Sequence, residues 1–218
     1  MKLTAVMVTC PERGSVRAQT LANLGATDWV DDVALAIDDG ASTDDRIARI
    51  DATWRKALAI AAESRADVAL AMEDDLDFNR HLRANLLTWS RLHGVTDGGA
   101  FFGSLYNPGF YAVHSRPAHQ YDVMDPAGCW GGQALLVSPA LARYFLTHWS
   151  EERGEPDLRM PRLASRLVPI YYHRPSLVQH IGQVSTWGGR AHQAPDFDPD
   201  WRAPGLRDQP TSMRMKRL

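Results

Sequence analysis

Residues 69–78 of the chain read ALAMEDDLDF, and this stretch decides the fold class. The apolar run from Val68 to Met72 has the length of a buried strand. It ends abruptly in Glu73, Asp74 and Asp75. Carboxylates this close together repel one another. The stretch is therefore either a solvated acidic turn or a place where a cation is held, and its spacing alone leaves both alternatives open.

Short apolar runs of this kind alternate along the chain with segments of helical periodicity. This alternation predicts an α/β fold, with a mixed, mostly parallel sheet flanked by helices on both faces. Residues 107–128, rich in Pro, Gly, His and Tyr, are predicted to be a long loop of the kind that often acts as a lid. The predicted strands are Leu3–Thr9, Val33–Ile37, Val68–Met72, Ala100–Leu105, Gln133–Val137 and Leu167–Tyr172, and the predicted helices are Ser15–Leu24, Ser42–Ser64, Leu82–Leu92, Pro139–Trp149 and Leu163–Leu167.

The composition is that of an ordinary globular protein, with 44% hydrophobic and 23% charged residues. A net charge of -2 creates no overall field that attracts nucleic acid or an anionic membrane. No apolar stretch approaches the ~20 residues of a membrane span. Two cysteines, Cys10 and Cys129, suggest no disulfide framework, so we expect a cytoplasmic protein. We expect one domain over residues 1–190 and an irregular segment over residues 191–218.

Polar segments follow the first three predicted strands: TCPERG, DDGAS and EDDLD. Ligands of such sheets bind at the carboxyl ends of the strands. Neither a dinucleotide fingerprint after the first strand nor a P-loop is present in the sequence. Mg²⁺ and Mn²⁺ prefer oxygen ligands and often join one or two carboxylates to substrate phosphates. Strand alternation places Glu73 and Asp75 on one side and Asp74 on the other, which favours a metal–diphosphate site.

Four segments together resemble glycosyltransferases of the GT-A fold. VMVTCPERG (6–14) resembles the nucleotide-binding opening of that fold, and LAMEDDLDF (70–78) resembles its acidic metal motif in the E-D-D form. CWGGQALLVSPALARYF (129–145) is similar to a segment of the bacterial lipooligosaccharide galactosyltransferases. PSLVQHIGQVST (175–186) is similar to a segment of the branching N-acetylglucosaminyltransferases. The resemblance implies the transfer of a sugar from a nucleotide-diphosphate donor with the help of Mn²⁺ or Mg²⁺.

The resemblance also implies roles for individual residues. Asp75 would be the main metal ligand, and His180 would be a distal ligand or a diphosphate contact. Glu73 and Asp74 would support the metal or contact the ribose. The remaining implied contacts are Thr9, Pro11 and Arg13 with the nucleotide, Asp38 or Asp39 with the base or ribose, and Gly131, Gly132 and Gln133 with the sugar and acceptor.

An inverting transferase needs a carboxylate that takes the proton of the acceptor hydroxyl, directly or through one water. The resemblance places this base at the start of a helix, where the present sequence reads GEPDLRMPRLAS (154–165). Asp157 is the candidate and Glu155 the alternative, and Pro156 suits the first turn of a helix. An acid at this position also favours the helix dipole without any catalytic role.

We therefore predict a metal-dependent, inverting glycosyltransferase with a nucleotide-sugar donor, which the family suggests is a UDP-sugar. Two other functions stay open. One is a nucleotidyltransferase of the sugar-nucleotide pyrophosphorylase type, whose usual G-x-G-T-R-[LM] loop is absent here, and the other is a non-catalytic nucleotide- or sugar-binding module. The acceptor is open between a glycan, a lipid-linked sugar, a protein and a metabolite. A modified DNA base is less favoured, although Arg159, Arg162, Arg166 and the tail (Arg214, Lys216, Arg217) would supply a local basic face. The many Arg, Ala and Asp residues suggest a GC-rich bacterial or phage genome.

Overall fold

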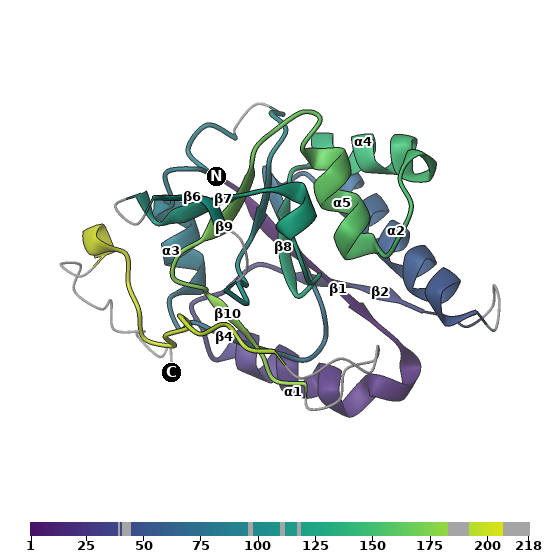
Figure 1. Cartoon of the computed structure of the whole chain (residues 1–218). Coiled ribbons are helices and arrows are strands. Elements are labelled where there is room, and N and C mark those ends of the chain that lie inside the picture. The colour runs from purple at the N-terminus through teal and green to yellow at the C-terminus, as the bar shows by residue number, and fades with distance from the viewer. Residues whose placement is uncertain are drawn as a thin grey trace.

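The structure is a computed structural model that describes residues 1–38, 40, 45–95, 98–109, 112–116, 119–182 and 192–206, with the backbone alone in 112–116. Its centre is one eight-stranded sheet (Figure 1). The strand order across this sheet is β2 (Val33–Ile37), β1 (Leu3–Thr9), β3 (Val68–Met72), β8 (Ala134–Val137), β5 (Phe102–Ser104), β9 (Ile170–His173), β7 (Tyr121–Met124) and β6 (Ala112–Arg116).

Six of these strands point the same way, and only β7 and β8 run against them. β1 pairs in parallel with β2 and β3, and β5 pairs in parallel with β9. β8 is antiparallel to β3 and β5, and β7 is antiparallel to β6 and β9. The predicted α/β class, with a mixed and mostly parallel sheet, is therefore confirmed.

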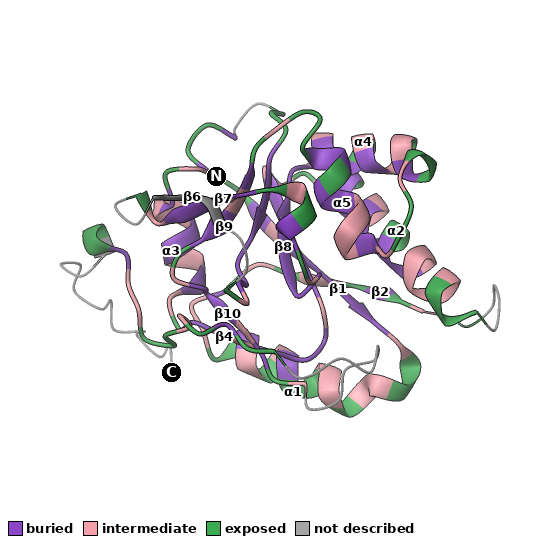
Figure 2. Cartoon of the chain, viewed as in Figure 1, coloured by how far each residue is buried: buried purple, intermediate pink, exposed green. Residues whose placement is uncertain are grey.

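Helices cover both faces of the sheet (Figure 1). One face packs against α2 (Arg46–Glu63), α4 (Pro139–His148) and α5 (Pro156–Ala164). The other face packs against α1 (Gly14–Gly25) and α3 (Leu82–Thr88). The central strands are consequently buried on both sides, as Figure 2 shows, which explains why β3 reads as an unbroken apolar run rather than an alternating one.

Some helix boundaries differ from those predicted. α2 begins at Arg46 because the Asp45 side chain caps it, accepting hydrogen bonds from the backbone N–H groups of Ile47 and Ala48. α3 ends at Thr88, and turns follow it. The helix expected over 163–167 is wrong for most of its length, because α5 runs from Pro156 to Ala164 and turns follow over 165–167.

The long loop predicted over residues 107–128 is corrected by the structure. Strands β6 and β7 form an antiparallel hairpin there and extend the main sheet beyond β9. A short 3-10 helix, Pro126–Gly128, follows. The β7 sequence, YDVM, includes Asp122, which is only 2% exposed. A buried acid in mid-strand removes the apolar pattern by which a strand is recognised.

Two strands that the sequence did not reveal form a separate small sheet. β4 (Leu76–Phe78) follows the acidic cluster directly, and β10 (Val178–His180) pairs with it in antiparallel fashion. Cys10 and Cys129 are free thiols. Within the described ranges, no helix has both the length and the apolar character needed to cross a membrane.

Candidate metal and nucleotide site

The site lies where β1, β2 and β3 end. These three strands are parallel neighbours, so the residues that follow them share one edge of the sheet. The backbone N–H of Asp38, after β2, donates to the carbonyl of Thr9, the last residue of β1. The described residues of the three polar segments therefore lie on one rim, as predicted.

Asp74 faces the loop after β1. Its Oδ2 accepts a hydrogen bond of 2.5 Å from Thr9 Oγ1, and its Oδ1 accepts one of 2.7 Å from Arg13 Nε. Its backbone carbonyl accepts from Thr20 Oγ1, on α1, at 2.6 Å. Pro11 starts the 3-10 helix Pro11–Arg13 that carries Arg13. Burial raises the pKa of Asp74, although Thr9 and Arg13 stabilise its charged form. Asp74 thus fixes the acidic turn to β1 and α1.

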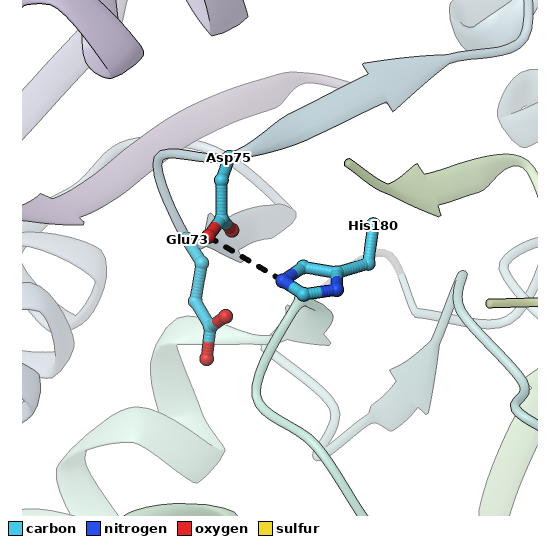
Figure 3. A group of neighbouring side chains, drawn as sticks. All are labelled: Glu73, Asp75 and His180. Carbon is cyan, nitrogen blue, oxygen red and sulfur yellow. Dashed lines mark ion pairs between the residues drawn. The ribbon is translucent and has the colours of Figure 1, made fainter. Parts of the chain in front are cut away.

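Glu73 and Asp75 turn the other way and meet His180 (Figure 3). One ligand atom from each of these three residues lies within 4.8 Å of the others. His180 Nε2 is 3.4 Å from Asp75 Oδ2. The approach follows from strand pairing, because Leu76 of β4 lies opposite His180 of β10. The backbone N–H of Ile181 also donates to the Asp75 carbonyl, at 3.0 Å.

The cluster contains strongly interacting charges. Burial, and next the Asp75 carboxylate, raise the pKa of Glu73 to about 8. Burial opposes ionisation of Asp75 as well, but His180 and Arg13 outweigh it and lower the pKa of Asp75. Arg13 Nη2 lies 2.7 Å from Asp75 Oδ2. Asp75 in turn raises the pKa of His180. The site concentrates negative charge with only partial compensation from the chain itself.

The three residues fit a divalent cation. Asp75 Oδ1 and His180 Nδ1 are buried, and neither has a hydrogen-bond partner among the described residues. A buried carboxylate oxygen without a partner is costly, and a cation would remove that cost. Two carboxylates and one imidazole form an oxygen-rich donor set that suits Mn²⁺ or Mg²⁺. A Cβ on Gly182 would lie 2.6 Å from Asp75 Oδ2 and 2.7 Å from His180 Nε2, so the backbone closes tightly over the cluster.

A glycine segment connects the acidic cluster to α5. Gly131 has a φ of +85°, which favours glycine, and its N–H donates to Asp157 Oδ2 at 3.0 Å. A Cβ on Gly132 would lie 2.8 Å from the Trp54 ring. The Gln133 carbonyl accepts from the Glu73 N–H at 3.0 Å. Glu73 and Asp157 therefore lie on either side of one short, closely packed segment.

The two base candidates lie at the start of α5. Asp157 is in its first turn, and burial raises the pKa of Asp157. Asp157 also contributes to the raised pKa of Glu73, after burial, Asp75 and His180. Glu155 occupies the N-cap position, without a side-chain capping hydrogen bond. Burial, followed by the charge of Asp157, raises the pKa of Glu155 as well.

Asp38, predicted to lie near the base or ribose, is bonded to other parts of the chain. Arg49 Nη2 lies 2.7 Å from Asp38 Oδ2, and the Gly40 N–H donates to Asp38 Oδ1 at 3.0 Å. Asp38 is therefore already bonded within the chain. Asp39 lies outside the described residues.

Sequence reasoning missed Tyr106 and His192. The Tyr106 hydroxyl lies 2.7 Å from His192 Nδ1, and the His192 ring stacks on His180, with 5.4 Å between the ring centroids. His192 occurs in an irregular stretch without periodicity, and Tyr106 follows a strand among other apolar residues. Neither residue carries a signal in the sequence, because the fold alone brings them to the site.

No protein-family model and no curated protein matches the chain. Solved structures resemble it at low identity. A galactosyltransferase, LgtC, in complex with donor and acceptor sugar analogues, has 11% identity over 78% of this chain and 72% of that one, with a TM-score of 0.48. TarS 1-349 of S. aureus has 10% identity over 82% of this chain and 60% of that one, with a TM-score of 0.48. A197 from STIV has 13% identity over 93% of this chain and 98% of that one, with a TM-score of 0.49. All three identities are at or below 13% and all three TM-scores are below 0.5, so these likenesses concern the path of the chain alone.

Proposed function

We propose that the chain is a metal-dependent glycosyltransferase that moves a sugar from a nucleotide-diphosphate donor, with UDP as the expected nucleotide, to an acceptor hydroxyl with inversion. The observation that carries the proposal is the convergence of Glu73, Asp75 and His180 at the carboxyl edge of the sheet. The unpartnered Asp75 Oδ1 supports it. Acidic surface turns are common without a metal, but a buried cluster with an orphan oxygen is not expected of a solvated turn.

In this proposal, Glu73, Asp75 and His180 hold Mn²⁺ or Mg²⁺. When bound, the cation supplies positive charge that stabilises a leaving nucleotide diphosphate. Thr9 and Arg13 lie beside the diphosphate, and Pro11 and Asp38 or Asp39 lie toward the nucleoside. Arg13 has further N–H groups beyond the two that bind Asp74 and Asp75, and the described residues provide no hydrogen bond to them.

Asp157 is the proposed base, with Glu155 as the alternative. Its raised pKa brings it closer to neutrality, where a general base works best. The Gly131 N–H donates to Oδ2 of this carboxylate at 3.0 Å and so orients it. Gly132 and Gln133 line the sugar side, between Asp157 and Glu73. The acceptor itself is proposed only as a hydroxyl compound.

Calorimetric titration tests the proposal. UDP, GDP and CMP are titrated into the wild type in Mn²⁺ and in EDTA, and then into Asp75→Asn. We expect one nucleoside diphosphate to bind only with Mn²⁺. Asp75→Asn should weaken this binding by more than the roughly 10- to 100-fold typical of residues that merely orient a ligand.

Asp77→Asn is the matched control. Asp77 belongs to the same acidic stretch, but it lies on β4, opposite Gln179 and outside the cluster. This variant should bind the nucleotide like the wild type. Absence of nucleotide binding by the wild type in every condition would contradict the proposal. Equal losses of nucleotide affinity in both variants would mean that Asp75 acts only through the overall negative charge of the acidic stretch.

A further inference from the structure

His192 reaches the metal site from the end of the described chain. Its ring stacks on that of His180, with centroids 5.4 Å apart and planes inclined by 28°. Its Nδ1 lies 2.7 Å from the Tyr106 hydroxyl. His192 is itself solvent-exposed, although its ring contacts the buried His180.

The hydrogen bond with Tyr106 fixes the His192 ring. Tyr106 is 1% exposed, and burial raises the pKa of Tyr106 far above its usual value, so the hydroxyl keeps its proton. Among the described residues, the hydroxyl has no hydrogen-bond partner besides His192 Nδ1. A buried hydroxyl that donated to nothing would be costly, so the O–H donates and Nδ1 accepts. The proton of the neutral His192 ring is then on Nε2.

The backbone around His192 is anchored to the strand that carries His180. Gln179 of β10 binds Ala194 from both sides: its Nε2 donates to the Ala194 carbonyl at 3.1 Å, and its Oε1 accepts from the Ala194 N–H at 2.9 Å. Ser176 Oγ donates to Asp196 at 2.7 Å. His180 belongs to β10, and the segment that carries His192 is bound to the same strand through Gln179 and Ala194.

His180 needs such support. A histidine that binds a metal is usually oriented by a hydrogen bond from its other ring nitrogen. His180 Nδ1 is buried and makes no hydrogen bond of ordinary geometry within the described part of the chain. The backbone of His192 nevertheless helps to raise the pKa of His180. The His192 ring lies against the His180 ring instead, and it would restrict rotation of that ring.

We propose that His192 is a positioning residue of the metal site: with Tyr106, it holds the His180 ring in the orientation in which Nε2 faces Asp75. This inference rests on the metal-binding role proposed above. It also gives residues 192–206 a part in the site, because they bring His192 to it.

The test measures Mn²⁺ affinity by calorimetry without nucleotide, together with thermal unfolding in EDTA. His192→Ala should weaken Mn²⁺ binding roughly 10-fold, the size typical of groups that orient a ligand. It also leaves the buried Tyr106 hydroxyl without its partner, so the unfolding temperature in EDTA should fall, and the two effects are measured separately. His192→Phe keeps a stacking ring and should recover most of the affinity. His93→Ala, at an exposed histidine outside the cluster, serves as the control and should bind like the wild type.

Three outcomes would overturn the inference. Wild-type affinity in His192→Ala would show that the stack does not position His180. Equal losses in His192→Ala and His192→Phe would mean that a stacking ring at this position does not hold His180. Failure of the wild type to bind Mn²⁺ would remove the proposed function as well, whereas the first two outcomes leave that function intact.

Discussion

At the scale of single residues, Arg13 explains how the chain tolerates so much negative charge. Its guanidinium contacts Asp74 and Asp75 at 2.7 Å each, and the side chains of both acids are at most 10% exposed. Removing one partner of a buried ion pair leaves the other charge uncompensated, which costs more than the pair contributes. Arg13 therefore acts as a built-in counter-ion of the acidic turn.

We expect Arg13→Gln to lower the metal-free stability by about 2 kcal/mol, less than for a fully buried pair because Arg13 is partly exposed. Added Mn²⁺ should raise the unfolding temperature more in this variant than in the wild type, because the cation then compensates charges that no arginine balances. Thermal unfolding in EDTA and in Mn²⁺ measures both effects.

Arg17→Gln is the matched control for Arg13. Arg17 Nη1 reaches Thr9 Oγ1 only at 3.4 Å, and the described contacts include no ion pair between Arg17 and either aspartate. This variant should respond to Mn²⁺ like the wild type. An Arg13→Gln protein as stable as the wild type in EDTA would refute the counter-ion role.

At the scale of elements, the small β4–β10 sheet completes the site. It places His180 beside Asp75 across 105 positions of sequence, since the register pairs Leu76 with His180. Gly182 follows β10, where a Cβ would collide with Asp75 Oδ2 and His180 Nε2. The site thus depends on a backbone approach that only glycine permits.

Gly182→Ala should therefore weaken Mn²⁺ binding by at least about 10-fold, because displacement of ligand atoms by a few tenths of an ångström already degrades a preorganised site. The measurement is Mn²⁺ calorimetry. Gly205→Ala is the control, since a Cβ there would meet no atom within 4 Å. Unchanged affinity in Gly182→Ala would mean that the segment after β10 moves away when the cation binds.

The elements also show what the sequence could reveal. Strands β1, β2 and β3 were predictable because they are apolar runs bounded by polar turns. The same pattern located the acidic rim, including Thr9, Arg13 and Asp75. Strands β4 and β10 have only three residues each and no alternation, so pairing alone defines them. The β6–β7 hairpin was missed because Asp122 is buried within it through contacts that lie far away in the sequence.

At the scale of the whole molecule, the site joins segments from both halves of the chain. Residues 192–206 pack beside α3, where the buried Asn85 donates to the Trp201 carbonyl and accepts from the Ala203 N–H. His192 lies at the other end of this segment. On the opposite side of the cluster, the Gly131–Gln133 segment connects Glu73 to Asp157 and hence to α5. In the proposed function, the donor side and the acceptor side are thus formed by different elements that meet at Glu73.

This division predicts that a substitution at Asp157 can abolish sugar transfer without weakening nucleotide binding. Asp157→Asn keeps an oxygen that can accept from the Gly131 N–H but removes the base. We expect sugar transfer to fall by roughly 10²- to 10⁴-fold, the contribution of a general base. Mn²⁺-dependent nucleotide binding should stay at the wild-type level, since Asp157 does not belong to the cluster of Glu73, Asp75 and His180.

Glu155→Gln provides the comparison. Glu155 is the alternative base and occupies the N-cap position of α5, just before the first turn that contains Asp157. Transfer to an acceptor found by glycan and metabolite screening, measured beside calorimetry, separates the possibilities. A large loss in Glu155→Gln with an active Asp157→Asn would move the base to Glu155. Full transfer by both variants would exclude a base at the start of α5, and with it the inverting mechanism proposed for this chain.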